Sequence, residues 1–159
     1  MPNSDLEKNN RYLFFKLDDE IYAISAYNIL EVVDYKAIRK VPQTNSSIKG
    51  VTNIRGELIA VVDPKIRLEN RCSTISKRTS FVIMKIFDKV TNEEVSIALM
   101  VDMILEVGDI PKVDVLPAPE FGTKIDERFI KNIIKYENGY VTVLKISLVL
   151  DIHELSIKG

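Results

Sequence analysis

The chain has 159 residues, of which 46% are hydrophobic and 28% are charged, and its formal net charge is -1. This composition is typical of a folded soluble protein and excludes a disordered one. A charge so close to zero provides no strong field to attract nucleic acid or an anionic membrane. The apolar runs are too short to span a bilayer, and residues 1–10 are polar and lack the apolar core of a signal peptide. We therefore expect a cytoplasmic protein with a flexible N-terminus, residues 1–10.

Two β-hairpins are predicted from pairs of apolar runs. Residues 12–17 and 21–24 flank the short acidic turn 18–20. Residues 81–87 and 95–101 flank a longer polar loop. Runs of this length, rich in β-branched and aromatic residues and separated by turn residues, are typical of antiparallel strand pairs.

A third hairpin is predicted between Ile48 and Pro64. An apolar run of strand composition follows Gly56 and ends at Asp63-Pro64. The pair Arg55-Gly56 indicates the turn, because glycine readily adopts a positive φ. Alternation along the strand predicts that Ile59 and Val61 face one side, with Leu58 and Val62 on the other.

The chain also repeats itself. Residues 29–34 return as 104–109, 48–51 as 130–133, and 56–61 as 139–144. The three repeated segments occur in the same order in both halves, at a spacing of about 75 to 83 residues. They predict two copies of one five-stranded arrangement. The two copies are expected to pack together, because each alone would bury only a thin core.

The remaining segments are predicted as loops and one short helix. Residues 36–47 and 111–128 contain prolines and are expected to be loops. Residues 147–155 are the best helix candidate, with Ser147 as its N-cap. The apolar face of this helix would consist of Leu148, Ile152 and Leu155.

The sequence contains no recognisable catalytic or metal-binding constellation. His153 is the only histidine and Cys72 the only cysteine, so a histidine-based metal site, a catalytic dyad and an intrachain disulfide are not expected. The acidic residues 18–20 and 93–94 lie in predicted turns, where carboxylates are normally solvated. No glycine-rich phosphate loop is present. We expect a protein that is not an enzyme and needs no cofactor or metal.

The hairpin between Ile48 and Pro64 resembles the signature of the CheW-like domain family of bacterial chemotaxis coupling proteins. That signature is a G-V-x-N-x-R-G hairpin leading into an apolar strand that ends in Asp. It falls here on Gly50, Val51, Asn53, Arg55, Gly56 and Asp63. The resemblance runs from about residue 11 to 155, and includes the strand at 12–17, the segment 29–33 and the loop 116–121.

The resemblance implies an all-β fold of two five-stranded, SH3-like barrels on a shared core, followed by a short C-terminal helix. It implies one domain, residues 11–155. Its first barrel is expected at about 11–72, its second at about 79–146 and its helix at about 147–155.

The resemblance also implies a function. Members of the family are non-catalytic adaptors that couple chemoreceptors to a histidine kinase in signalling arrays. The positions that match the receptor contacts of the family are Ala26, Ile29, Glu31, Gly50 and Arg55, and Leu58 is the candidate kinase contact. Ala26 is smaller than the aliphatic residue usual at its position. Glu31 and Arg55, both at strand ends of one predicted barrel, are expected to form a bidentate ion pair that orients the guanidinium.

Two other classes of protein compete with this interpretation. A small barrel that binds oligonucleotides or oligosaccharides would need a basic groove with interleaved aromatic residues, and the pI of about 5.9 and the absence of Trp argue against it. A hydrolase or transferase would need a set of catalytic residues that the sequence does not offer. Within the family, CheW-like domains also occur fused to receiver or kinase segments, and no such segment is present here, so a stand-alone adaptor is expected. Which receptors it would serve, and with what output, does not follow from the sequence.

Overall fold

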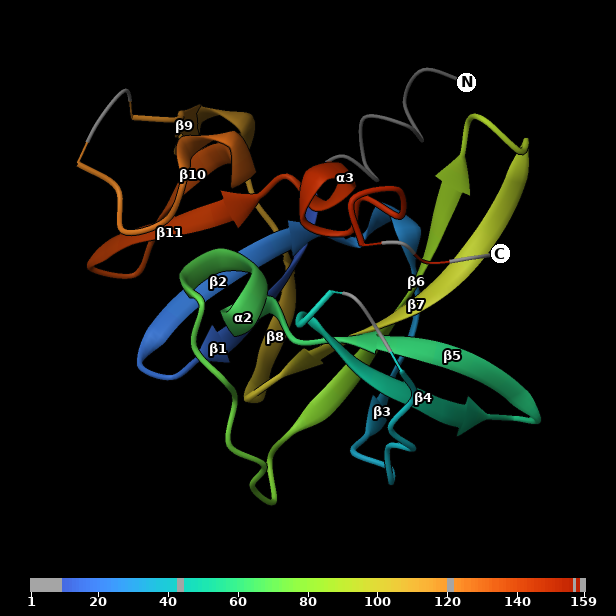
Figure 1. The fold of residues 1–159 in the computed structure, drawn as a ribbon. Coiled ribbons are helices and arrows are strands. Elements are labelled where there is room, and N and C mark those ends of the chain that lie inside the picture. The colour runs from blue at the N-terminus through green and yellow to red at the C-terminus, as the bar shows by residue number, and fades with distance from the viewer. Residues whose placement is uncertain (1–9, 43–44, 120–121, 156, 158–159) are drawn as a thin grey trace.

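The computed structural model describes residues 10–42, 45–119, 122–155 and 157, so the expectation for residues 1–9 lies outside it. Two strongly bent sheets, each forming a small SH3-like barrel, make up the molecule (Figure 1). The five-stranded barrel contains, in sheet order, β3 (Ile29–Asp34), β6 (Ser80–Asp88), β7 (Glu93–Val101), β5 (Glu57–Val62) and β4 (Ile48–Ile54). The six-stranded barrel contains β8 (Met103–Asp109), β1 (Arg11–Leu17), β2 (Glu20–Ser25), β11 (Gly139–Leu144), β10 (Ile130–Tyr136) and β9 (Val115–Pro117).

Short helices connect the strands. The helix α2 (Pro64–Glu69) follows β5, and α3 (Ile146–Val149) follows β11, so the two occupy equivalent places in the two halves of the chain. Single 3-10 turns, η1 (Ala26–Asn28), η2 (Lys112–Asp114) and η3 (Glu127–Phe129), precede β3, β9 and β10.

The predicted repeat is present, but the two halves exchange their first hairpins. The hairpin β1–β2 joins the strands β8, β10 and β11 of the second half, and β6–β7 joins β3, β4 and β5 of the first. The exchange is completed by two parallel pairings, β5 with β7 and β11 with β2. The expected division into a barrel at 11–72 and another at 79–146 is therefore wrong. A repeat in the sequence cannot reveal it, because the strands are alike whichever barrel they join.

Irregularities of the sheets repeat as well. The register of β3 against β6 shifts between Ile29 and Glu31, and that of β8 against β1 shifts between Ile104 and Glu106. A second pair of shifts lies between Ile48 and Gly50 and between Ile130 and Asn132. Such bulges bend a strand and redirect its side chains. The repeat in the sequence is thus a repeat of bent strands.

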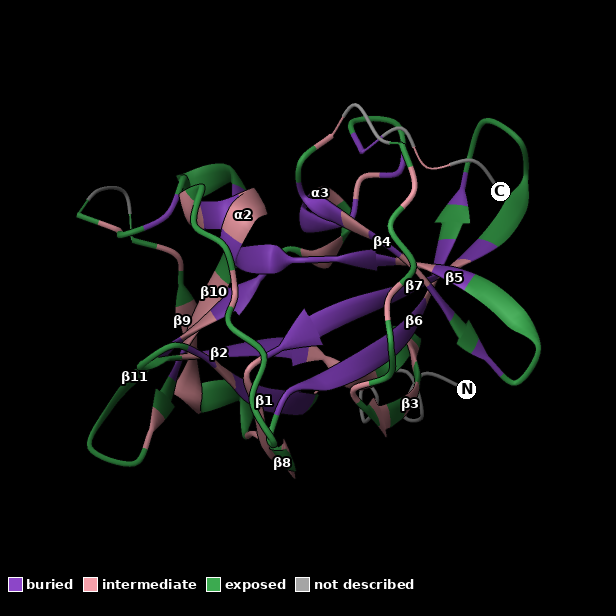
Figure 2. Cartoon of the chain, turned by 60° about the horizontal axis from the view of Figure 1, so that its bottom comes forward, coloured by how far each residue is buried: buried purple, intermediate pink, exposed green. Residues whose placement is uncertain are grey.

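Apolar side chains form three clusters. Figure 2 shows that the central strands, which supply many of them, are largely buried. The interior of the five-stranded barrel contains Ile54, Ile59, Val61, Phe81, Ile83, Ala98 and Met100. The interior of the six-stranded barrel contains Tyr12, Phe14, Ala23, Ile134, Val141 and Val143. The largest cluster lies between the barrels and combines the opposite faces of β1 and β6, such as Phe15 and Met84, with the C-terminal segment. The expected shared core is confirmed. The strands β1 and β6 are buried on both faces, which explains their continuous apolar runs.

Two expectations for the loops and the helix need correction. The helix expected at 147–155 is only α3, which ends at Val149, and Ser147 lies inside it and does not cap it. The chain turns at Asp151, whose side chain accepts hydrogen bonds from the backbone N–H groups of His153 and Glu154. These hydrogen bonds compete with a continuing helix. The apolar residues predicted for this helix nevertheless face the shared core. In the predicted loop 111–128, the strand β9 adds a sixth strand to one barrel.

Candidate functional site

The hairpin turn between β4 and β5 presents Arg55 to solvent. Arg55 and Gly56 have φ values of 54° and 87°, a combination that corresponds to a type I′ turn and favours Asn-Gly. The side-chain oxygen of Asn53 accepts a hydrogen bond of 2.8 Å from the N–H of Gly56 and stabilises the turn. Arginine therefore adopts a backbone conformation that is unfavourable for it, and 77% of its side chain is exposed.

Glu31 contacts this arginine from the other edge of the sheet. The edge strands β3 and β4 do not pair with each other in the sheet order. The guanidinium Nη2 of Arg55 lies 2.8 Å from the carboxylate Oε1 of Glu31, whose side chain is 25% exposed. The predicted ion pair is thus confirmed, through a single contact and not a bidentate one. It connects the turn to β3 and restricts the orientation of the guanidinium.

The second half contains a related contact. Glu106 on β8 corresponds to Glu31 in the repeat and accepts a hydrogen bond from the hydroxyl of Tyr136, at the end of β10. This hydrogen bond, together with burial and the charge of Glu106, raises the pKa of Tyr136 to about 12. In both barrels a glutamate beside a bulge contacts the end of the neighbouring hairpin. Only the first half places an arginine there.

Gly50 has a structural role that is visible in the backbone. It is buried, with a φ of 144°, and a Cβ atom at this position would overlap the carbonyl of Arg39. The backbone of Arg39 exchanges two hydrogen bonds, of 2.8 and 2.9 Å, with Val51. Glycine is required because the segment after β3 pairs with β4 in an antiparallel bridge at this point and leaves no room for a side chain. Gly50 therefore does not offer an exposed contact.

The other residues expected to contact partners lie near β3 and on β5. Ala26, in η1, and Ile29, at the start of β3, are partly buried, and Ile29 packs against the shared core. Exposed apolar side chains accompany them: Tyr27, Leu30 and Val32 are 57%, 52% and 40% exposed. Leu58 is 61% exposed, whereas its neighbour Ile59 is 3% exposed, as the alternation predicts. Val62 shares the side of Leu58 but is buried in the shared core.

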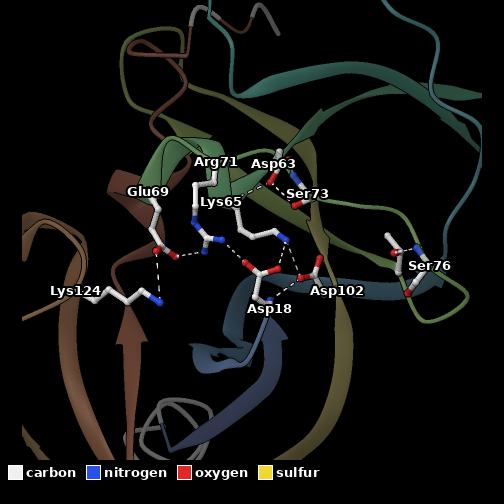
Figure 3. Close-up of polar contacts among 10 residues, drawn as sticks. Asp18, Asp63, Lys65, Glu69, Arg71, Ser73, Ser76, Asp102 and Lys124 are labelled. Carbon is white, nitrogen blue, oxygen red and sulfur yellow. Dashed lines mark hydrogen bonds and ion pairs between the residues drawn. The ribbon is translucent and has the colours of Figure 1, made fainter.

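Sequence reasoning missed a buried ion cluster around Lys65 (Figure 3). The side chain of Lys65, in α2, is 2% exposed, and its Nζ lies 2.7 Å from Asp18 and 2.9 Å from Asp102. Burial opposes the charge on Lys65, but the two carboxylates outweigh it and its pKa is raised. The hydrogen bond from Lys65 lowers the pKa of Asp18. These aspartates occupy the β1–β2 turn and the β7–β8 link, so the cluster joins the two barrels. The only signal in the sequence was the acid at each turn.

A second cluster fixes the C-terminal segment. Arg67 of α2 donates hydrogen bonds to the carbonyls of Leu148 and Val149 and contacts Glu154 at 2.8 Å. Arg128 also contacts Glu154, at 3.1 Å. Hydrogen bonds from Arg128 and Arg67 lower the pKa of Glu154 to about 2. The guanidinium groups of Arg128 and Arg67 both lie over the ring of Phe129, at 4.4 Å and 5.1 Å from its centroid respectively. These contacts connect α2, α3 and η3.

Neither cluster has the form of a catalytic or metal site. Around Asp18, Glu69 and Arg71, an open hollow is lined by acids and bases that pair with one another. Within the described residues, no group of three or more His, Cys, Asp or Glu side chains is arranged to hold a metal ion. None of the helices in that part of the chain is long and apolar enough to cross a membrane.

Comparison with known proteins gives a consistent result. The model of the CheW-like domain matches residues 11–157. The chain is 26% identical to a chemotaxis protein CheW of Treponema pallidum, over 89% of this chain and 78% of the relative. It is 30% identical to the protein FrzA of Myxococcus xanthus, over 75% and 71%. A crystal structure of the scaffolding protein TtCheW from Thermoanaerobacter tengcongensis superposes with a TM-score of 0.77 at 28% identity, covering 89% of this chain and 87% of that one.

Proposed function

The chain belongs to the CheW-like domain family, and we propose that it is an adaptor that couples methyl-accepting chemoreceptors to a histidine kinase and so controls the activity of the kinase. The relatives and the scaffolding structure support a non-catalytic chemotaxis scaffold. In the proposed role the protein binds the cytoplasmic tip of the receptor at one face and the regulatory domain of the kinase at another. It works in the bacterial cytoplasm and reaches the membrane array only through these partners.

The proposal depends mainly on the conformation of Arg55, which is exposed, has a positive φ and is paired with Glu31. An exposed arginine at a positive φ contributes no apolar burial and lies where Asn or Gly would be more favourable. Residues held in a poorly populated conformation are often retained for function. Glu31 restricts the guanidinium, so less side-chain entropy would be lost when a partner binds. An oriented arginine beside exposed apolar residues has the composition of an interface anchor.

The receptor face is proposed to be centred on Arg55, Glu31 and Ile29, with Ala26 at its edge. Leu30 and Val32, exposed on the same strand as Glu31, supply apolar contact area. Gly50 contributes indirectly, because it lets the segment that follows β3 lie against β4. The smaller Ala26 leaves more room for the partner at this edge.

The kinase face is proposed to include Leu58. This side chain is 61% exposed in the strand that follows the turn, and its cross-strand neighbour is the exposed Asn53. An exposed leucine on a well-ordered strand offers apolar area at little entropic cost. Since Leu58 projects from the side of β5 opposite to Ile59 in the barrel interior, a substitution here tests binding without disturbing that interior.

The test is a binding assay with purified components. A receptor cytoplasmic fragment and the regulatory domain of a histidine kinase from the same genome are each titrated with the protein, and the ternary complex is isolated by size exclusion. The proposal requires binding to each partner and a complex that contains all three. If the protein binds only one of them, or if the two compete for it, the coupling function is wrong.

A further inference from the structure

The basic residues of this chain are not evenly distributed. Residues 35–56 contain five basic and no acidic side chains, and residues 70–87 contain four basic and no acidic ones. The rest of the chain carries 13 basic and 23 acidic side chains. The formal net charge of -1 thus conceals two basic segments in an otherwise strongly acidic protein.

The structure brings parts of these two segments together on the five-stranded barrel. The N–H of Tyr35 donates a hydrogen bond of 3.2 Å to the carbonyl of Thr79. Lys36 and Arg78 are the immediate neighbours of this hydrogen-bonded pair in the sequence. The backbone on the far side of the loop is fixed by the two hydrogen bonds between Arg39 and Val51.

The loop from residue 35 to residue 40 is held in place by contacts with the five-stranded barrel. Tyr35 and Ile38 pack against the interior cluster of the five-stranded barrel. The hydroxyl of Thr52 donates a hydrogen bond of 3.1 Å to the carbonyl of Ala37. Gly50 leaves the space in which the backbone of Arg39 lies against β4. The loop is therefore held by apolar anchors and backbone contacts, while its basic side chains take no part in holding it.

These basic side chains are exposed, and no acid in the described part of the chain pairs with them. Lys36, Arg39, Lys40, Lys77 and Arg78 are all exposed, and none of them forms an ion pair with another described residue. By contrast, Arg55, Arg71 and Lys85 of the same two segments are each paired with an acid. The remaining basic residue, Lys49, lies on β4 and is partly buried. We call the five exposed residues without an ion pair in the described structure the basic loop surface.

We propose that the basic loop surface, formed by Lys36, Arg39, Lys40, Lys77 and Arg78, is a docking site for an acidic patch on a folded protein. Opposite charges across an interface orient the encounter and raise the association rate. A folded protein suits this site better than a long polyanion or a membrane. Both of the latter would extend past the basic loop surface and meet the acidic remainder of the chain, which repels them. The surface also lacks the stacked aromatic platform of single-strand binding proteins, since Tyr35 is anchored against the barrel.

The experiment uses the full chain and a fluorescein-labelled octaglutamate peptide, whose short length limits it to an area the size of the basic loop surface, as a stand-in for an acidic patch. Binding is measured by fluorescence anisotropy at about 20 mM and about 300 mM salt, because screening at the higher concentration removes exposed charge interactions. The test variant carries Lys36→Gln, Arg39→Gln and Lys40→Gln. The matched control carries Lys131→Gln, Lys135→Gln and Lys145→Gln, three exposed lysines that form no ion pair with another described residue. Circular dichroism confirms that both variants melt as the parent does.

The expected result is binding at low salt that disappears at high salt, weakens about fivefold or more in the test variant, and changes less than twofold in the control. Amide chemical shifts perturbed by the peptide should cluster at residues 35–40 and 77–79. Equal losses in the two variants, or no binding at low salt, would overturn the proposal. So would tighter binding, dependent on the same three residues, of a deoxythymidine octamer or of vesicles containing phosphatidylserine. None of these outcomes depends on the receptor and kinase titrations, so the two proposals fail separately.

Discussion

The Nη2 atom of Arg55 lies 2.8 Å from the Oε1 atom of Glu31, and this contact joins the β4–β5 turn to β3 at the opposite edge of the five-stranded sheet. Because the arginine is 77% exposed, the pair contributes about 1 kcal/mol or less to stability. Its significance lies in orientation, since the contact with Glu31 restricts a guanidinium that is otherwise largely exposed.

Replacing Arg55 should separate folding from binding. Asn is favoured over Arg at this positive φ, so we expect Arg55→Asn to leave the melting temperature unchanged or raise it. The same variant should bind the receptor fragment roughly tenfold or more weakly and bind the kinase domain as the parent does. Arg55→Lys should not restore binding, because lysine lacks the planar fork. Calorimetric titration against each partner checks this, and a variant that still binds the receptor normally would contradict the role of Arg55.

The pair can be tested by exchange as well. Glu31→Arg combined with Arg55→Glu keeps opposite charges at the same two positions. If the pair itself matters, the double variant should bind the receptor better than either single variant, as a double-mutant cycle measures. Additive losses would show that the two residues act independently.

Much of the fold follows from local patterns in the sequence. The hairpins and the burial of Ile59 and Val61 depend on alternation within a few residues, and the structure confirms them. The exchange of hairpins between barrels depends on parallel pairing of strands distant in sequence, which no local pattern encodes. Within the candidate site, the Glu31–Arg55 pair was predictable because the family resemblance placed both in one barrel. The burial of Lys65 was not, because its partners lie 47 and 37 residues away.

The strand β5 provides a matched pair of positions for a stability test. Val61 is fully buried inside the five-stranded barrel, whereas Leu58 on the same strand is 61% exposed. Val61→Ala should lower the free energy of unfolding by about 1–3 kcal/mol through lost burial and a residual cavity. Leu58→Ala should change it by less than about 0.5 kcal/mol. Urea denaturation of both variants measures the difference, and equal effects would refute the assignment of faces.

Gly50 should not tolerate a side chain. Alanine at this position would meet the carbonyl of Arg39 and would have to adopt a φ of 144°. We expect Gly50→Ala to destabilise the fold by about 2–3 kcal/mol or to displace the loop before β4. Gly139→Ala is the control, because no atom lies within 4 Å of the position its Cβ would take. Thermal melts of the two variants should differ clearly, and similar melts would mean that the loop moves aside freely.

Lys65 should matter more for stability than any exposed lysine. Lys65→Met preserves most of the apolar stem but leaves Asp18 and Asp102 without their shared cation. We expect a loss of about 2–3 kcal/mol, below the range for fully buried pairs because the side chain of Asp18 is 40% exposed. Lys124→Met, at a 54% exposed position with two weaker contacts, should have little effect. Restoring part of the loss with Asp102→Asn in the Lys65→Met background would confirm that uncompensated charge is the cause.

The C-terminal ion cluster should make the stability of the fold decrease at acidic pH. The pKa of Glu154 falls from 4.5 to about 2 through its contacts with Arg128 and Arg67. A carboxylate whose pKa is lower in the folded state stabilises the fold fully above the unfolded pKa, and that contribution is lost as the pH falls through the folded one. Glu154→Gln should therefore melt a few degrees below the parent at pH 7, and the difference should shrink between about pH 4.5 and 2. Glu127→Gln, at an exposed position without an ion pair among the described residues, should follow the parent at every pH. A difference between Glu154→Gln and the parent that stays constant down to pH 2 would show that the glutamate acts through packing and not through its charge.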